Sequence, residues 1–164
     1  MLVFETTSAD ETYDFGRKLA RLLKPDDVLC LSGNLGAGKT LLTQGITAGL
    51  KVNEPAHSPT FTVLNVYQGM TNQGQEIDIY HFDLYRLEQP HELADIGFDY
   101  YVGAGGIAIV EWPEKFSEFL PEEHLWLTLK AGEEENERVI SFRPVGDRYK
   151  ELCEELKQGA HPSY

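Results

Sequence analysis

The spacing of apolar residues at the start of the chain predicts a strand and then an amphipathic helix. Val3-Phe4 is a short apolar pair, and Ser8-Ala9-Asp10-Glu11, which follows it, has the spacing of a helix capping box. Apolar side chains then recur every three or four residues until Lys24-Pro25, at Phe15, Leu19, Leu22 and Leu23. We therefore expect a helix that packs one face against a sheet.

The middle of the chain changes between strand-like and helix-like runs. Asp27–Ser32 is largely apolar, which is typical of a strand covered on both faces, and Thr40–Leu50 has a helical pattern that ends near Gly49. Two pairs of alternating segments, each joined by a polar connection, predict antiparallel hairpins. These pairs are Thr62–Tyr67 with Ile77–Phe82, and Leu125–Leu129 with Arg138–Phe142.

The remaining segments complete an α/β pattern. Pro90–Ile96, with Gly97 behind it, predicts a short helix, and Phe98–Val102 predicts a second one. The apolar strand Ile107–Val110 follows, and Asp147–Lys157 predicts a terminal helix. Because no repeat or low-complexity segment interrupts the chain, we expect one domain with a mixed sheet and helices on both faces.

Length and cysteine content narrow the class of protein. A chain of 164 residues buries enough surface to fold without disulfides or a structural metal. Its two cysteines, Cys30 and Cys153, fit no metal-binding spacing, so we expect reduced thiols in the core. The apolar runs have the length of strands, with neither a signal segment nor a membrane-spanning run. We therefore expect a cytoplasmic protein that makes no membrane contact.

The charge of the chain limits its partners. The formal net charge is −13, from 27 acidic and 14 basic residues, which argues against binding nucleic acid through a broad basic face. Much of the acidity lies in the turn Glu133–Glu135 and on the terminal helix, where it favours solubility. Contact with RNA is therefore expected only through a partner protein.

One motif indicates chemistry directly. Residues 33–40 match the phosphate-binding loop G-x-x-x-x-G-K-[ST], between the apolar run Val28–Leu31 and a helical pattern. In such a loop, backbone N–H groups surround a phosphate, the lysine reaches β- and γ-phosphate oxygens, and the threonine reaches Mg²⁺. The expected nucleotide-binding residues here are Gly33, Asn34, Leu35, Gly36, Ala37, Gly38, Lys39, Thr40 and Leu41. Residues 1–164 are thus predicted to form a single P-loop NTPase-like domain with α/β/α layers, whose mixed sheet includes antiparallel hairpins.

The loop alone does not fix the reaction, because motors, switches and kinases all use one. A guanine-specific switch normally adds N-K-x-D and D-x-x-G segments, and this sequence contains neither. Small-molecule kinases usually carry several arginines in a lid, whereas the six arginines of this chain are scattered. A GTPase is therefore disfavoured, and other motifs must decide among the remaining classes.

Three further segments combine with the loop into a resemblance to a known family. They are Ser58-Pro59-Thr60-Phe61-Thr62, His81-Phe82-Asp83-Leu84-Tyr85-Arg86 and Val110-Glu111-Trp112-Pro113-Glu114. With these motifs the chain resembles the TsaE family from about Ser8 to Leu129. The resemblance implies a small ATPase, with ATP or ADP and Mg²⁺ as ligands, that bacteria need to make threonylcarbamoyladenosine (t6A) in tRNA. It also implies a TsaB–TsaD-type complex as partner, only indirect contact with tRNA, and slow hydrolysis without the partner.

The resemblance supplies expected roles for the polar residues of these motifs. Mg²⁺ prefers hard oxygen ligands and keeps several waters, so one hydroxyl and one or two carboxylates suffice from the protein. Thr40, Asp83 and Glu111 fit this need, and catalysis is expected to depend on Lys39, Asp83 and Glu111. Our hypothesis is that Glu111 ligates the metal or its water and Asp83 orients water or the metal shell. Which carboxylate touches Mg²⁺ directly stays open.

Two groups of neighbouring residues have more than one interpretation. Ser58 and Thr60 resemble a first switch segment that senses the γ-phosphate, and the alternative is an ordinary proline turn. His81 and Tyr85 alternate with Asp83 near a strand end and are either catalytic or structural. Arg86 pairs either with acidic neighbours or with phosphate.

Two more positions are candidates for contact with the nucleotide. Trp112 follows a carboxylate and is expected either beside the nucleotide or in a pocket of a partner. Thr12 lies near the start of the first helix, in a segment that is our candidate for adenine recognition.

Two other function classes stay open at this stage. A small-molecule kinase would transfer the γ-phosphate to an acceptor and yield a phosphorylated product. A nucleotide-dependent binding module would hold ATP without hydrolysing it and would bind its partner equally well after the change of Glu111. The pair of carboxylates favours hydrolysis over the binding module.

Overall fold

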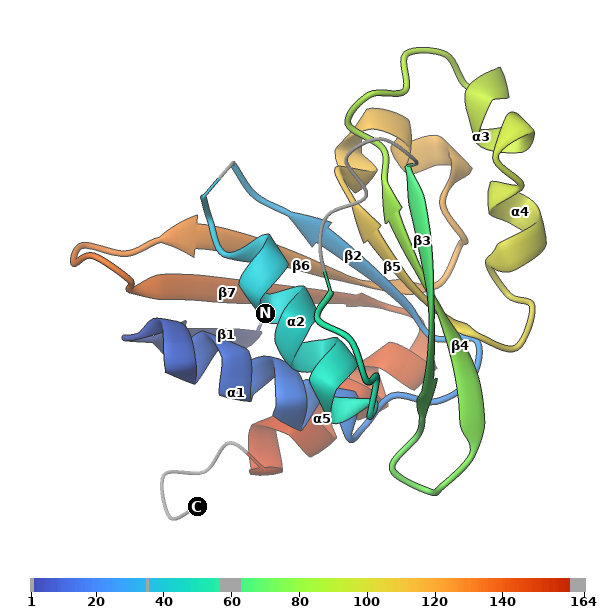
Figure 1. Ribbon diagram of the computed structural model, residues 1–164. Helices are drawn as coiled ribbons and strands as arrows, with labels where there is room; N and C mark the ends of the chain where they lie inside the picture. The colour runs from blue at the N-terminus through green and yellow to red at the C-terminus, as the bar shows by residue number, and fades with distance from the viewer. Residues whose placement is uncertain (1, 35, 57–62, 160–164) are drawn as a thin grey trace.

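Seven strands form one mixed sheet at the centre of the molecule (Figure 1). The computed structural model describes residues 2–34, 36–56 and 63–159. Within these ranges the strands are β1 (Leu2–Thr6), β2 (Val28–Ser32), β3 (Leu64–Met70), β4 (Glu76–Asp83), β5 (Ile107–Glu111), β6 (His124–Ala131) and β7 (Arg138–Val145). They lie in the order β1-β7-β6-β2-β5-β4-β3.

The centre of the sheet is parallel and its edges are antiparallel. β2 pairs in parallel with β5 on one side and with β6 on the other, and β5 pairs in parallel with β4. Both predicted hairpins are confirmed, as the antiparallel pairs β3–β4 and β6–β7. β4, β6 and β7 run past the predicted segments, whereas β3 is shifted along the chain and runs from Leu64 to Met70. At one edge β1 pairs antiparallel with β7, a long-range contact that the local pattern did not specify.

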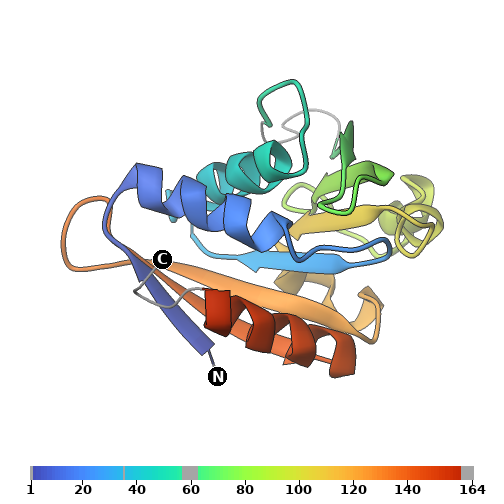
Figure 2. The same ribbon diagram turned by 90° about the horizontal axis from the view of Figure 1, so that it is seen from below.

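Helices cover both faces of this sheet. In the described part of the chain they are α1 (Ala9–Ala20), α2 (Lys39–Gly49), α3 (His91–Asp95), α4 (Phe98–Tyr101), the 3₁₀ helix η1 (Pro113–Phe119) and α5 (Asp147–Gly159). Figure 2 shows α1 and α2 side by side on the same side of β2. The expected α/β/α architecture is confirmed, whereas η1 was not predicted. None of the described helices combines the length and apolar character needed to cross a bilayer.

The residues of β2 show why both faces need cover. Leu29 and Leu31 belong to one hydrophobic cluster, to which α1, α2 and α5 contribute side chains. Val28 and Cys30, which alternate with them, belong to a second cluster built with α3, α4 and η1. A strand with two buried faces reads as a continuous apolar run, which is the pattern seen in the sequence.

The backbones of α1 and α2 approach each other closely at two glycines. A Cβ atom added to Gly45 of α2 would lie 2.1 Å from the carbonyl oxygen of Tyr13, and one added to Gly16 of α1 would lie 2.6 Å from that of Leu42. Two glycines therefore let the helix backbones touch, which fixes where α2 begins and ends over the sheet.

We expect Gly45→Ala to destabilise the protein by about 1–3 kcal/mol, because the new methyl group overlaps backbone atoms that cannot turn aside. Thermal or urea unfolding followed by circular dichroism measures this change. Gly159→Ala is the matched control, since nothing lies within 4 Å of the added Cβ atom in α5. Equal stability of the two variants would contradict the close packing of α1 on α2.

The two cysteines are free and buried, as the sequence analysis expected. Burial raises the pKa of Cys30 to about 12 and also raises the pKa of Cys153. A thiol with a raised pKa holds less of the reactive thiolate at any pH below that value.

We therefore expect neither thiol of the native protein to react readily with Ellman's reagent at about pH 8, where an ordinary cysteine reacts. Both should react once the chain is unfolded in guanidinium chloride. Rapid reaction of the native protein would show that one of these core positions opens to solvent.

Candidate functional site

The phosphate-loop sequence lies between the end of β2 and the start of α2, as predicted. Gly38 is the N-cap residue of α2 and has a left-handed backbone with φ of 102°. Because glycine has no side chain, Gly38 makes no side-chain cap hydrogen bond to the first turn of α2. Asn34, Gly36 and Ala37 lie in the described loop, and Leu35 lies outside the described residues. A helix start of this kind suits an anion such as phosphate.

Lys39 is the most unusual residue of this loop. It is only 6% exposed, and its Nζ atom has no hydrogen-bond partner within the described structure. Nζ lies 4.0 Å from the centre of the Trp112 ring, over its face. Burial lowers the pKa of Lys39, while the nearby carboxylates of Glu111, Glu114 and Asp83 act in the opposite direction.

Asp83 and Glu111 lie side by side at the ends of two adjacent parallel strands. They are register partners in the pairing of β4 with β5, and Leu31 of β2 is the partner of Glu111 on the other side. Side chains alternate along a strand, so both carboxylates share the sheet face of Leu31, which packs with α2. The structure therefore brings Lys39, Asp83 and Glu111 together at one edge of the sheet.

Glu111 is held by a buried histidine. His81 is fully buried, and its Nε2 atom lies 2.5 Å from Oε2 of Glu111. When Nε2 carries the proton, it donates to Oε2 of the Glu111 carboxylate. His81 therefore contacts one of the predicted catalytic groups, in the position of a residue that orients it.

Asp83 is less buried and is tied to the chain that follows it. The backbone N–H of Tyr85 donates to Oδ1 of Asp83 at 3.0 Å. Burial raises the pKa of Asp83, an effect that this hydrogen bond partly offsets and that the charge of Glu111 reinforces. Arg86 follows in the same turn and is exposed. Its pairing with phosphate or with a carboxylate stays a prediction.

The oxygen donors at this edge fit Mg²⁺. Thr40 lies exposed in the first turn of α2, and the carboxylates of Asp83 and Glu111 lie on the adjacent strand ends. Among the described residues no group of three His, Cys, Asp or Glu side chains is arranged as a complete metal cage. A nucleotide-bound Mg²⁺ does not need one, because phosphate oxygens and waters supply most of its ligands.

Three predicted residues cannot be placed at the loop from the structure. Ser58 and Thr60, the predicted switch, lie outside the described residues. Thr12 is fully buried, and its hydroxyl lies 2.6 Å from that of Thr6, within the junction of β1 and α1. Its predicted contact with adenine stays a prediction.

The structure adds a residue of β7 that the sequence did not single out. Arg138 donates from Nη2 to the Gly36 carbonyl at 3.2 Å. A Cβ atom added to Gly38 would lie 3.4 Å from the Arg138 side chain, so the guanidinium group runs along the loop. No local signal could have found Arg138, because its place depends on the pairing of β7 with β6 and of β6 with β2.

Two further residues near the loop were also missed. Glu114, at the start of η1, accepts a hydrogen bond from the hydroxyl of Ser32 at the end of β2. Thr43 lies one helical turn after Lys39, fully buried, and its hydroxyl has no partner among the described residues. Both residues could have been found from the sequence. Glu114 is the last residue of the Val110–Glu114 motif, and Thr43 lies four residues after Lys39, on the same face of the helix.

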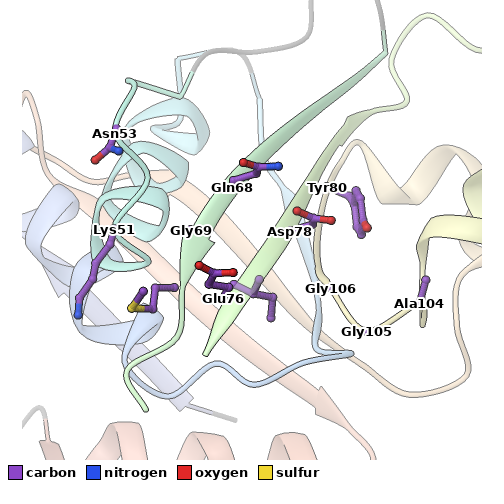
Figure 3. A pocket seen from close by; sticks show the side chains of 12 residues that line it. Lys51, Asn53, Gln68, Gly69, Glu76, Asp78, Tyr80, Ala104, Gly105 and Gly106 are labelled. Atoms are coloured by element: carbon purple, nitrogen blue, oxygen red, sulfur yellow. The ribbon is translucent and has the colours of Figure 1, made fainter. Parts of the chain in front are cut away.

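Two hollows in the surface differ in their relation to the loop. One, of about 640 Å³, lies between the loop, Trp112, Glu114 and the end of β6. The other lies toward the opposite end of β4 from Asp83, where side chains of β3, β4 and the segment after α2 meet, among them Gln68, Asp78 and Lys51 (Figure 3). The second hollow contains no residue of the phosphate loop, so of these two it is the first that adjoins the candidate site.

Comparisons with known proteins agree with the motifs. The sequence model of the family described as "Threonylcarbamoyl adenosine biosynthesis protein TsaE" matches residues 6–140. The chain is 42% identical to the tRNA threonylcarbamoyladenosine biosynthesis protein TsaE of Bacillus subtilis (strain 168), over 96% of this chain and 94% of that protein. It is 36% identical to the protein of the same name from Treponema pallidum (strain Nichols), over 80% and 93% of the two chains.

A solved structure shares the fold. The crystal structure of YdiB from Bacillus subtilis superposes with a TM-score of 0.78 and 37% identity, and the match covers 96% of this chain and 95% of that one. Together with the sequence matches, this likeness confirms the resemblance that the motifs indicated.

We expect Arg138→Met to weaken the binding of ADP about threefold to tenfold, because the loop loses a charged donor that holds the Gly36 carbonyl. Isothermal titration calorimetry measures this change. Arg143→Met is the matched control, since Arg143 lies on the same strand but over the ring of Trp126. Equal affinity of the two variants for ADP would show that the loop keeps its shape without Arg138.

Proposed function

The chain belongs to the TsaE family, and we propose that it is the ATP-binding and ATP-hydrolysing component of the machinery that makes threonylcarbamoyladenosine in tRNA. The names of its relatives support the pathway. One observation carries the activity: Lys39 keeps a buried Nζ atom without a hydrogen-bond partner in the described structure, inside a phosphate-loop sequence and facing Asp83 and Glu111. Such a cation is suited to phosphate oxygens.

In this proposal the loop binds the phosphates and two strand ends supply the acid groups. The N–H groups of residues 33–41 and the ammonium of Lys39 bind the β- and γ-phosphates of ATP. Thr40, Asp83 and Glu111 hold Mg²⁺, which when bound neutralises charge on the phosphate oxygens. Asp83 orients the attacking water, and His81 keeps Glu111 in place through the hydrogen bond at 2.5 Å.

The remaining nucleotide contacts come from flanking residues. Trp112 lies against Lys39 and borders the hollow beside the loop, which favours contact with the nucleotide. Contact of Thr12 with the nucleotide requires the buried Thr6–Thr12 pair at the start of α1 to open. Ser58 and Thr60 form the switch that responds to the γ-phosphate. Arg86 pairs with acidic groups or phosphate near the same edge.

We propose that hydrolysis resets a TsaB–TsaD-type complex between rounds of transfer in the cytoplasm. The isolated protein should hydrolyse ATP slowly, because a phosphate loop without an ordered stabilising group loses roughly a thousandfold or more in rate. The net charge of −13 supports contact with tRNA through the partner rather than directly.

We expect Glu111→Ala and Asp83→Ala each to lower ATP hydrolysis about a hundredfold or more, because each removes an oxygen ligand or a water-orienting group. ADP binding should remain, since the loop is intact. The measurement is ADP formation from ATP and Mg²⁺, first by the protein alone and then with purified TsaB–TsaD-type complex.

Asp95→Ala, which removes an exposed carboxylate of α3, is the control and should behave as the unchanged protein. Near-normal turnover by the Glu111 variant would overturn the assignment of catalytic groups. If the partner complex neither binds nor stimulates the protein, the role in t6A synthesis is wrong. A phosphorylated acceptor product would instead identify a kinase.

A further inference from the structure

We propose that Tyr85 and Lys115 are positioning residues that act on the phosphate-loop lysine through the ring of Trp112. The proposal rests on the phosphate-binding role given to Lys39 above. Four side chains form a continuous series of cations and rings. Lys39 Nζ lies 4.0 Å from the Trp112 ring centre, the ring centres of Trp112 and Tyr85 are 4.9 Å apart, and Lys115 Nζ lies 5.6 Å from the ring centre of Tyr85.

The ring of Trp112 orients the ammonium group of Lys39. Its ammonium has no hydrogen-bond partner in the described structure, so neighbouring charges attract it without fixing its direction. A cation over the face of an indole ring is attracted by the electron density of the ring. The Trp112 ring is therefore the contact that sets the direction of Lys39 before phosphate binds.

The ring of Trp112 needs contacts with other side chains to stay in position, because the Trp112 backbone is strained. Its backbone has φ of 60° and ψ of 45°, the left-handed region, which a bulky residue rarely adopts. Pro113 follows it, and a residue before proline is disfavoured in the right-handed helical region. Trp112 thus sits in a strained joint between β5 and η1, and contacts beyond its own backbone must keep its ring against Lys39.

Tyr85 is held by hydrogen bonds at both its backbone N–H and its backbone carbonyl. Its backbone N–H donates to Asp83, and its backbone carbonyl accepts from Lys115 Nζ at 2.5 Å. The ring packs against that of Trp112 in a tilted contact, with an interplanar angle of 46°. Yet 53% of Tyr85 is exposed, so burial in a core does not account for its place. Two of its contacts connect it to the site: the backbone N–H to Asp83 directly, and the ring to Lys39 through Trp112.

The arrangement predicts which step of the reaction depends on Tyr85. Ground-state binding of the nucleotide phosphates rests mainly on the N–H groups of the loop, which Tyr85 does not touch. The ammonium of Lys39 matters most when charge moves on the γ-phosphate during its transfer to water. Loss of the Tyr85 ring should therefore lower kcat roughly tenfold while the affinity for ADP changes less than about threefold.

The test uses a protein in which Trp112 is the single tryptophan, made by Trp126→Phe. Its emission spectrum is recorded without nucleotide for the parent and for Tyr85→Ala, Tyr85→Phe and Lys115→Met. ADP formation and ADP affinity are measured for the same variants. Tyr100→Ala is the control, since Tyr100 is the more exposed of the two tyrosines, at 76%, and contacts Tyr101 edge-on in α4, away from the loop.

We expect Tyr85→Ala and Lys115→Met to shift the emission of Trp112 to longer wavelength and to lower kcat, the first more than the second. Tyr85→Phe should restore both values, because it keeps the stacked ring. The control should match the parent in both. Unchanged emission together with unchanged kcat in Tyr85→Ala would overturn the proposal, as would a Tyr85→Phe variant no better than Tyr85→Ala.

A nucleotide-independent arm separates this proposal from the proposed function. Lys39→Met, in the same single-tryptophan background, removes the ammonium over the ring and should change the emission of Trp112 without any ATP present. If that change occurs but the parent neither binds ADP nor hydrolyses ATP, the ring contact stands and the ATPase assignment fails. If the parent hydrolyses ATP but Lys39→Met leaves the emission unchanged, the positioning role is wrong.

Discussion

The arrangement of this protein depends on the burial of one unpaired positive charge. Lys39 is 6% exposed and its Nζ atom has no hydrogen-bond partner in the described structure, a condition that is costly unless other charges compensate. The compensation comes from elsewhere in the chain, through the carboxylates of Asp83, Glu111 and Glu114 and the ring of Trp112. The fold must therefore bring the ends of β2, β4 and β5 and the start of η1 together around the ammonium group of Lys39, so that this cation stays buried and available to an anion.

Parallel pairing in the centre of the sheet meets this requirement. Because β2, β5 and β4 run in the same direction, their carboxyl ends lie at one edge, next to the loop that leaves β2. Alternation along β4 then places His81 and Asp83 on the same face, two residues apart, while Glu111 lies beside Asp83 on β5. A shift of one residue in either register would turn these polar side chains into the opposite hydrophobic cluster.

The sequence predicted those parts of the fold and the candidate site that depend on local order. The phosphate loop, the two hairpins and the strand ends that carry Asp83 and Glu111 follow from spacing, and the structure has them where they were expected. It did not predict that Arg138 lies along the loop, because that contact depends on the lateral order of β7, β6 and β2. The sequence also did not predict the contact of Trp112 with Lys39, because no sequence pattern indicates a left-handed backbone at a tryptophan.

The carboxylates near the loop affect how this acidic protein could bind a ligand with several negative charges. Three carboxylates lie near the ammonium of Lys39, and the guanidinium of Arg138 lies along the loop as a second cation. The N–H groups at the start of α2 offer partial positive charge, which favours one phosphate but does not offset the repulsion of several. A divalent cation that arrives with the nucleotide would lie against the carboxylates and reduce this repulsion. Carboxylates that repel a bare polyanion favour its complex with a divalent cation, so under the proposed function Asp83 and Glu111 would also select the form of the nucleotide.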